Sequence, residues 1–422
     1  MIPKSQVPAL FSLFMPDRST ILVSVNGPDH PGISAGLMDV LNAGDAEIYD
    51  VEQIVVRGRL TLNVLVGLAA ERATIRDLLF FGWEEGLELD FEVIDTSPTP
   101  PKKLAIVTLI GLRVGADDFG AAARAIALGG GNIERIFRLS RYPVLSYELT
   151  ISNGDINAIR AGLVEAAARS PIDVAIQPEG LERRSKRMVV LDVDSTLIQD
   201  EVINLLAAEA GVEDEVSAIT ALAMDGKVEF EESLRRRVAL LRGLNAEALG
   251  RVGDAITLTA GARTFIRTLR RLGMKTAIVS AGFTRFTDVL ASDLGIDHSL
   301  SNTLAISDGL LTGEIDGDLI DGPAKAEFLR SIAESEKIPL SQVVAVGDGA
   351  NDLDMLAAAG LGIAFNAKPV VAERADTSVS VPFLDAILFL MGVRRDFVDA
   401  ADAADPEYAE GPLLEVEGTP PI

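Results

Sequence analysis

An apolar run that ends in two acids constrains this chain more than any other stretch. Met188 to Leu191 are all apolar, which is typical of a central parallel strand with helices on both faces. Asp192 and Asp194 follow at once. Ligands of open α/β sheets bind beyond the carboxyl ends of the strands, so these acids lie where such folds do chemistry. Taken alone, however, the pair is explained as well by a structural or metal-binding role as by catalysis.

Two further apolar strands end in polar residues, and strands alternate with helices between 262 and 353. The sequence therefore predicts an α/β fold with a doubly wound parallel sheet. The two further strand ends read Ser280-Ala281-Gly282 and Gly347-Asp348-Gly349-Ala350-Asn351-Asp352, and Lys325 begins the helix before the second of them. Singly, these residues have ordinary interpretations as turns, a helix cap and a solvated helix start. Together they predict clustered carboxylates that need a cation, and Mg²⁺ suits such ligands.

The segment from about 200 to 258 predicts a helical cap inserted after the first strand, which we expect to act as a lid. Its helices are expected at 201–210, 213–224 and 229–242. On the last one, Arg237 falls within the apolar stripe, about 20° from Phe230 on a helical wheel. A guanidinium there needs a partner. A substrate carboxylate fits, and an internal ion pair with a nearby acid is the alternative.

The N-terminal part repeats the order βαββαβ with a period of roughly eighty residues. We therefore expect two ferredoxin-like domains, at 18–97 and 103–178, joined by a proline-rich linker at Thr96 to Pro101. The domain with the polar strand ends is expected at 185–393. Residues 394–422 are acidic and rich in Ala and Pro, which predicts a loose tail.

Composition excludes several classes of function. The 422 residues include no cysteine and two histidines, so a zinc site of His and Cys ligands is nearly excluded. A formal charge of −25 argues against a nucleic-acid partner. No apolar run is long enough to cross a bilayer and the first residues do not resemble a signal peptide, so we expect a cytoplasmic protein without a membrane partner.

From Met188 to Phe383 the motifs resemble those of the haloacid dehalogenase superfamily, and within it those of the phosphoserine phosphatases. The resemblance implies Mg²⁺-dependent hydrolysis of O-phospho-L-serine through an aspartyl-phosphate, the last step of serine biosynthesis. It implies that Asp192 is the nucleophile, that Asp194 is the general acid and base, and that Ser280 and Lys325 hold the phosphoryl oxygens. Asp192, the backbone carbonyl of Asp194 and Asp348 would bind the metal, supported by Asp352.

The same resemblance implies a set of substrate-binding residues. Arg237 would bind the α-carboxylate and Glu201 the α-ammonium group. The other implied members are Met224, Phe230, Gly282 and Asn351, beside Ser280 and Lys325. One departure is Thr259-Ala260-Gly261, where the family commonly has Thr-Pro-Gly. This turn is expected to be looser, without loss of a catalytic group.

The two βαββαβ units resemble ACT domains, which sense amino acids, chiefly through the turn Gly27-Pro28-Asp29-His30-Pro31-Gly32. The resemblance implies an amino-acid effector, expected to be L-serine, and a homodimer. Asp29 and Gly32 are the expected regulatory residues of the first copy, and Gly111, which ends a first strand as Gly27 does, is that of the second copy. The alternative is a structural or dimerising module in which Asp29 caps a helix and Gly32 forms a tight turn.

Three other functions remain open. A phosphatase for another small phosphomonoester would use the same catalytic groups. Arg237 and Glu201 indicate an amino acid, but they do not distinguish substrates that differ by a methylene group. A receiver-like signalling protein also combines an Asp, a hydroxyl, a Lys and Mg²⁺. However, Asp194 argues against it, since an acid beside the nucleophile speeds loss of the phosphoryl group. A sensor with a silent catalytic domain conflicts with the complete set of acids.

Overall fold

The computed structural model describes residues 18–69, 71–95, 102–224 and 227–405, with the side chain of Met224 excluded. The chain divides into two compact units, Met1–Pro101 and Lys102–Ile422. The expected linker at 96–101 and the tail from 406 lie outside the described residues. In the part that is described, no helix combines the length and the apolar character needed to cross a membrane.

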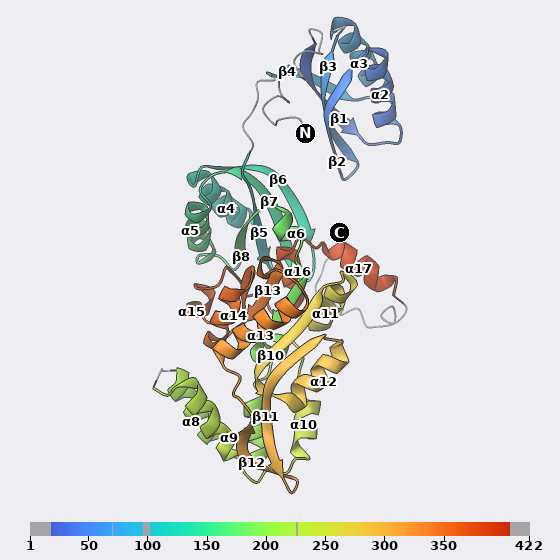
Figure 1. The fold of residues 1–422 in the computed structure, drawn as a ribbon. Helices are drawn as coiled ribbons and strands as arrows, with labels where there is room; N and C mark the ends of the chain where they lie inside the picture. Colours follow the sequence, from blue (N-terminus) through green and yellow to red (C-terminus); the bar gives the residue numbers. More distant parts are fainter. Residues whose placement is uncertain (1–17, 70, 96–101, 225–226, 406–422) are drawn as a thin grey trace, which may run out of the picture. The chain divides into compact units, whose positions relative to one another are not determined.

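The first unit is a βαββαβ module. Its four-stranded sheet has the order β2-β3-β1-β4, and its two helices, α2 and α3, cover one face of the sheet (Figure 1). The elements are β1 (Ser19–Pro28), α2 (Ile33–Ala43), β2 (Glu47–Val56), β3 (Arg59–Leu68), α3 (Glu71–Glu85) and β4 (Glu88–Val93). Alternate residues of β1 and β3 point into the core between sheet and helices.

The second unit begins with another module of the same order, as the repeat predicted. Its sheet has the order β6-β7-β5-β8. The elements are β5 (Leu104–Gly111), α4 (Ala116–Leu128), β6 (Gly131–Ser140), β7 (Leu145–Asn153), α5 (Ile156–Ala167) and β8 (Asp173–Pro178). The sheet face opposite α4 and α5 packs on the rest of the unit, because Ile110, Leu139 and Ala175 belong to its large hydrophobic core.

The third domain holds a seven-stranded sheet of order β12-β11-β10-β9-β13-β14-β15, parallel except for β12. This confirms the predicted fold class. The strands are β9 (Met188–Leu191), β10 (Lys275–Phe283), β11 (His298–Ser307), β12 (Leu310–Asp316), β13 (Val343–Gly347), β14 (Leu361–Phe365) and β15 (Thr377–Val379). The strand that carries the two acids, β9, is central and fully buried.

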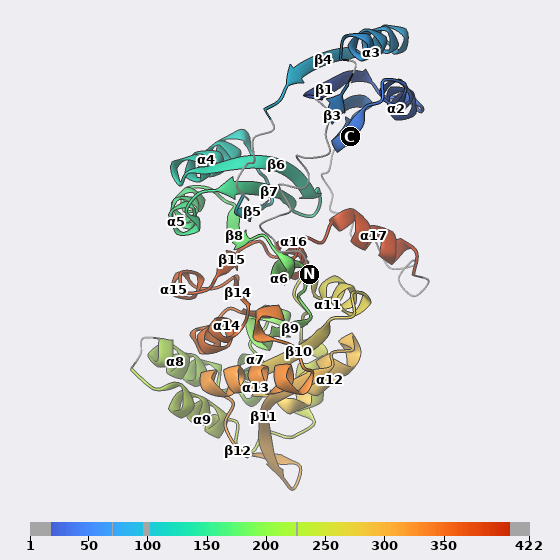
Figure 2. The ribbon, with the colours of Figure 1, turned by 45° about the horizontal axis from the view of Figure 1, so that its top comes forward.

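Helices cover both faces of this sheet. Alternate residues of β9 enter two different cores, Val189 and Leu191 on one face, Met188 and Val190 on the other. The first core includes α11 (Ala262–Arg271) and α12 (Thr284–Leu294), and the second includes α13 (Gly322–Ser335), α14 (Leu353–Ala358) and α15 (Pro369–Ala372). In Figure 2 the yellow helix α11 lies on the right of β9 and β10, and the orange helix α14 lies on their left.

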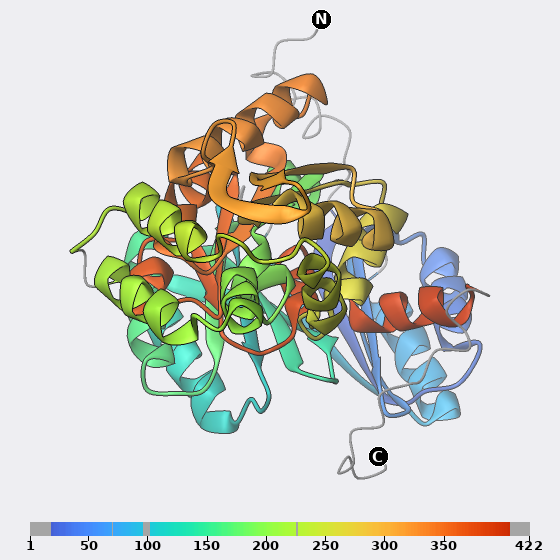
Figure 3. The ribbon, with the colours of Figure 1, turned by 90° about the horizontal axis from the view of Figure 1, so that it is seen from below.

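The predicted cap is helical, and it contains a fourth helix that the sequence did not indicate. Its helices are α7 (Val202–Ala210), α8 (Glu213–Met224), α9 (Phe230–Leu240) and α10 (Ala248–Ala255). The hairpin β11–β12 joins this end of the domain, because Gly243 donates to the backbone of Leu311 at 2.8 Å. Figure 3 shows the yellow-green cap helices and the orange hairpin at the same end.

The segment after 394 differs from the loose tail that was predicted. Residues Arg395–Ala403 form helix α17, which comes directly after the short helix α16 (Ile387–Leu390). Another short helix, α6 (Leu181–Arg184), lies between the second module and β9. Val398 of α17 is buried, and Asp402 bonds Arg267 and Arg271 of α11. Acidic side chains suggested solvation, but here they pair with arginines from a distant helix.

Candidate active site

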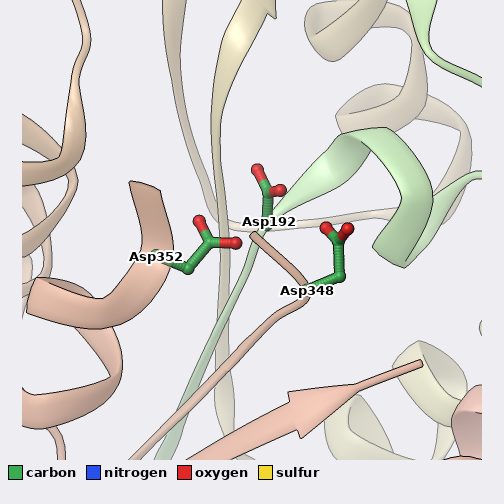
Figure 4. A group of neighbouring side chains, drawn as sticks. All are labelled: Asp192, Asp348 and Asp352. Atoms are coloured by element: carbon green, nitrogen blue, oxygen red, sulfur yellow. The ribbon is translucent and has the colours of Figure 1, made fainter. Parts of the chain in front are cut away.

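The site lies at the carboxyl ends of β9, β10 and β13, where the sequence placed it. Asp192 follows β9 directly, and its backbone N–H donates to Val346 of β13 at 2.9 Å. Asp348 and Asp352 come from the turn after β13. The three carboxylates each offer an oxygen within 4.8 Å of the others. Figure 4 shows them gathered around one region beyond the strand ends.

Lys325 supplies positive charge inside this cluster. Its side chain is fully buried, and its Nζ lies 2.6 Å from Asp192 Oδ1 and 2.7 Å from Asp352 Oδ1. Burial alone would lower the pKa of Lys325, but the charges of Asp192 and Asp352 raise it above its ordinary value. The ammonium group therefore stays charged, and it holds the two carboxylates in place.

One lysine does not neutralise the cluster. Burial raises the pKa of Asp192 well above its usual range, and the charge of Asp352 adds to this against the opposing effect of Lys325. Burial likewise raises the pKa of Asp348 to about 7, helped by Asp352 and Glu201. A hard divalent cation among these carboxylates would stabilise their ionised forms. The all-oxygen donor set therefore fits Mg²⁺.

Asp352 has a supporting position, because both of its oxygens already have donors. Oδ1 accepts from Lys325, and Oδ2 accepts from the backbone N–H of Gly349 at 2.9 Å. The preceding strand comes so close that a Cβ on Gly347 would lie 2.5 Å from the Asp352 carboxyl carbon. Only glycine at 347 leaves room for this carboxylate.

Asp194 lies in a kinked turn, Val193–Leu197, where Ser195 has a positive φ of 58°. Its Oδ1 accepts from the backbone N–H of Val202 and its Oδ2 from the hydroxyl of Ser280, each at 2.8 Å. Burial raises the pKa of Asp194, and these two hydrogen bonds oppose the rise. A carboxyl group with such a pKa can carry a proton.

Gly282 allows a close approach on the same side of the site. A Cβ at this position would lie 2.8 Å from both Asp194 Oδ2 and Ser280 Oγ. The Gly282 N–H donates to Ser280 Oγ at 2.6 Å. The structure therefore brings Asp194, Ser280 and Gly282 together.

The cap contributes Glu201 and Arg237. Glu201 precedes α7, and Ser195 Oγ donates to it at 3.0 Å. Although Glu201 as a residue is exposed, burial of its carboxylate raises its pKa, and Asp194 adds to the rise. Burial lowers the pKa of Arg237, whereas the charges of Glu201 and Asp194 raise it, so these groups share one electrostatic environment.

Arg237 differs from its two neighbours on α9. Arg235 and Arg236 are exposed and pair with Glu231 and Glu232 one turn earlier. The half-buried Arg237 bonds only the backbone carbonyl of Ser233, at 3.4 Å, and within the described residues it has no carboxylate partner. The internal ion pair that the sequence left open as an alternative is not formed.

The remaining predicted residues have different outcomes. Phe230 and Asn351 are half-buried, in α9 and in the turn after β13. Met224 ends α8, and its side chain lies outside the described residues. In the first module, Gly32 rather than Asp29 is the N-cap of α2, with φ 105°, and Asp29 donates its N–H to Gly58. Gly111 ends β5.

Sequence reasoning assigned no role to several residues that hold the site together. Thr196 Oγ1 donates to Asp348 at 3.3 Å, and Thr259 Oγ1 donates to the carbonyl of Thr196 at 2.7 Å. Asn302, which is buried, donates to the carbonyl of Ala281 at 2.7 Å and accepts from Ile320 at 2.9 Å. Asn302 lies in β11, a strand in which the sequence indicated no site residue. The Ala260 carbonyl accepts from Leu384, which holds the turn that departs from the family pattern.

Comparisons with known proteins agree with this geometry. Residues 186–360 match the haloacid dehalogenase-like hydrolase family, and residues 19–92 and 105–177 each match ACT domain families. A phosphoserine phosphatase of Streptomyces coelicolor is 49% identical over 406 residues, covering 94% of this chain and 98% of that protein. Phosphoserine phosphatase SerB2 of Mycobacterium tuberculosis is 47% identical over 399 residues, covering 93% and 97%. The crystal structure of a probable phosphoserine phosphatase from Vibrio cholerae is 32% identical, with a TM-score of 0.55 over 70% of this chain and 88% of that one.

Proposed function

Because this chain belongs to the phosphoserine phosphatases of the haloacid dehalogenase superfamily that carry two ACT domains, we propose that it hydrolyses O-phospho-L-serine to L-serine and phosphate. This would be the last step of serine biosynthesis. The observation that carries the substrate class is the unpaired guanidinium of Arg237, half-buried in the cap and near Glu201. A small zwitterion supplies a carboxylate for the first and an ammonium group for the second.

In the proposed first step, an oxygen of Asp192 forms a bond to phosphorus while the bond from phosphorus to the serine oxygen breaks. Asp194 gives its proton to that departing oxygen, so serine leaves as the neutral alcohol. In the second step Asp194 takes a proton from water, whose oxygen attacks phosphorus and releases Asp192. Ser280 and Lys325 bind the phosphoryl oxygens, and the buried ammonium of Lys325 offsets the approach of two anions.

We propose Mg²⁺ as the cofactor, bound by Asp192, Asp348 and the backbone carbonyl of Asp194. Asp352 supports these ligands through Lys325 and Gly349. When bound, the ion neutralises charge on the phosphoryl oxygens and on the carboxylates around them. The observation in favour is the all-oxygen cluster, in which the pKa of Asp192 and that of Asp348 are raised by burial.

The proposed substrate contacts come from the cap and the strand ends together. Arg237 binds the α-carboxylate and Glu201 the α-ammonium group. Phe230 and Met224 enclose the substrate from the cap, whereas Gly282 and Asn351 complete the site from the turns after β10 and β13. When such a cap closes over the substrate, it both selects the substrate and excludes water from the site.

The test is phosphate release from O-phospho-L-serine with Mg²⁺, compared with O-phospho-L-threonine and p-nitrophenyl phosphate. We expect preferential turnover of phosphoserine that is lost in Asp192→Asn. Arg237→Met should lower kcat/KM for phosphoserine by about two orders of magnitude, because a charge-assisted bidentate contact disappears. It should change turnover of p-nitrophenyl phosphate little.

Arg236→Met is the matched control, because Arg236 is one residue away but exposed and paired with Glu232. It should leave both activities unchanged. Equal losses in the two arginine variants would contradict the role of Arg237. Full activity of Asp192→Asn would remove the nucleophile assignment.

We further propose that an amino acid, L-serine first among candidates, regulates the enzyme through the first ACT domain, and that the protein is a homodimer. Two ACT family matches support an amino-acid effector, and the presence of Asp29 and Gly32 in the first turn favours the first copy as the binding one. Gly111, at the end of β5, is the proposed regulatory residue of the second copy. Inhibition by serine that is lost in Asp29→Ala, with unchanged activity in the absence of serine, is the expected result.

A further inference from the structure

Both carboxylate oxygens of Asp194 have a hydrogen-bond donor, and the donors belong to different parts of the domain. Ser280 Oγ, at the end of β10, lies 2.8 Å from Oδ2. The backbone N–H of Val202, the first residue of α7, lies 2.8 Å from Oδ1. Asp194 is thus held from one side by the sheet and from the other side by the first residue of the cap.

Local structure explains why the Val202 N–H is available. The first N–H groups of a helix have no partner within the helix. Glu201, the N-cap residue, is extended (φ −99°, ψ 108°), and its side chain makes no capping bond. The N–H of Val202 therefore finds its acceptor in the carboxylate of Asp194, eight residues earlier in the chain.

The two donors are not equivalent during the proposed reaction. Ser280 Oγ accepts from Gly282 N–H and gives its own hydrogen to Asp194. If Ser280 binds a phosphoryl oxygen, as the proposed function requires, its hydrogen points to that oxygen and no longer to Asp194. The Val202 N–H is then the remaining one of the two donors on Asp194.

We propose that the backbone N–H of Val202 is a positioning group for the general acid. It holds Oδ1 of Asp194, so that Oδ2 carries the proton toward the departing oxygen. The placement of the acid thereby depends on the first turn of the cap. This inference rests on the proposed function, because Asp194 acts as an acid only if the chain cleaves a phosphomonoester.

Val202→Pro tests the idea, because proline has no N–H. Proline is favoured at the first position of a helix. The extended backbone of Glu201 suits a residue that precedes proline. Val202→Ala is the matched control, since it keeps the N–H and removes a side chain that is 2% exposed.

The readout is kcat/KM for a series of aryl phosphates from p-nitrophenyl to phenyl phosphate. This constant reports on the steps up to departure of the leaving group, and these esters carry neither a carboxylate nor an ammonium group for Arg237 or Glu201. A good leaving group needs little help from an acid, whereas a poor one needs much. We expect Val202→Pro to leave p-nitrophenyl phosphate unchanged and to lower kcat/KM for phenyl phosphate by about tenfold.

A Val202→Pro variant with the wild-type dependence on leaving group, including an equal loss for every ester, would overturn the proposal. So would a Val202→Ala variant with the same steepened dependence. If the proline variant does not fold, as judged by circular dichroism, an ester in place of the 201–202 peptide bond removes the same N–H and carries the same comparison. Failure of the wild-type protein to hydrolyse any phosphomonoester would instead refute the proposed function.

Discussion

At the scale of single residues, the site is a problem of charge balance. Lys325 is fully buried between Asp192 and Asp352, so one ammonium group serves two carboxylates. Within the described residues Asp348 has no such partner, and Thr196 is its hydrogen-bond donor. Burial raises the pKa of Asp348 to about 7, and the negative charges of Asp352 and Glu201 add to the rise. These charges also explain why a cation belongs among these side chains.

This balance predicts how pH acts on the metal-free protein. The folded-state pKa of Asp348, about 7, exceeds its ordinary value of 3.8, so the fold binds this proton more tightly than the unfolded chain does. The resulting stability is fully present below about pH 4 and is lost as pH rises through about 7. We expect the free energy of unfolding to fall by about 1–3 kcal/mol across this range, measured by denaturant titration with EDTA.

Asp348→Asn is the control for that measurement, because it removes the titrating group. Its stability should depend less on pH than that of the wild type. Saturating Mg²⁺ should also flatten the wild-type dependence, because a bound cation favours the ionised carboxylate. Identical pH profiles for the wild type and Asp348→Asn would contradict the assignment.

At the scale of elements, helix α17 shows how a polar sequence becomes ordered. One of its acidic residues, Asp402, pairs with arginines of α11, and Asp402 Oδ1 lies 2.9 Å from Arg267 Nε. Asp385, just before α16, pairs with Arg395 at 2.7 Å. The same residue touches the turn of Gly261, where a Cβ would lie 2.2 Å from Asp385 Oδ1. Helix α17 thus contacts α11 through Asp402, and through Arg395 it contacts Asp385, which lies beside the turn of Gly261.

We expect Asp402→Ala to lower the free energy of unfolding by about 1–2 kcal/mol, because it removes an acceptor shared by two partly buried arginines. Asp399→Ala, on the same helix, removes only an exposed pair with Arg395 and should cost less than about 0.5 kcal/mol. Denaturant titration measures both. Equal losses would mean that the Asp402 contacts do not hold α17, and neither variant should change kcat for phosphoserine.

At the scale of the whole molecule, two modules of one topology have different surroundings. The second module packs against the phosphatase domain through polar contacts as well as apolar ones. Gln177 donates to the Leu390 carbonyl at 3.0 Å, and Asp173 accepts from the Ser380 N–H at 2.7 Å. Arg183, which is buried, pairs with Glu148 of β7 at 2.5 Å. The first module forms a compact unit by itself.

Calorimetry should therefore show two unfolding transitions, a smaller one for the first module and a larger one for the rest of the chain. Arg183→Met should lower the larger transition alone, at a cost of about 2 kcal/mol, because it leaves the half-buried carboxylate of Glu148 without its arginine partner. Arg184→Met removes an arginine that is 68% exposed and should shift neither transition. A single transition that moves as a whole in Arg183→Met would contradict this division.

Several features were predictable because they follow from local pattern. Apolar runs that end in Asp192, Ser280 and Asp348 predicted the parallel strands and the edge at which they meet, since period and strand-end polarity are properties of short segments. The period of the repeat predicted two βαββαβ modules. The position of Arg237 on its helix predicted an unusual arginine, because a helical wheel needs only sequence spacing.

Other features depended on contacts between distant segments, which no local pattern encodes. The fourth cap helix, the ordering of α17 and the hydrogen bonds of Asn302 each depend on partners from elsewhere in the chain. The N–H of Val202 carries no sequence signal at all, because every residue except proline has one. The sequence thus determined which side chains the site contains, whereas the tertiary structure decided which of them pair and which backbone groups hold them, because hydrogen bonds depend on position in space.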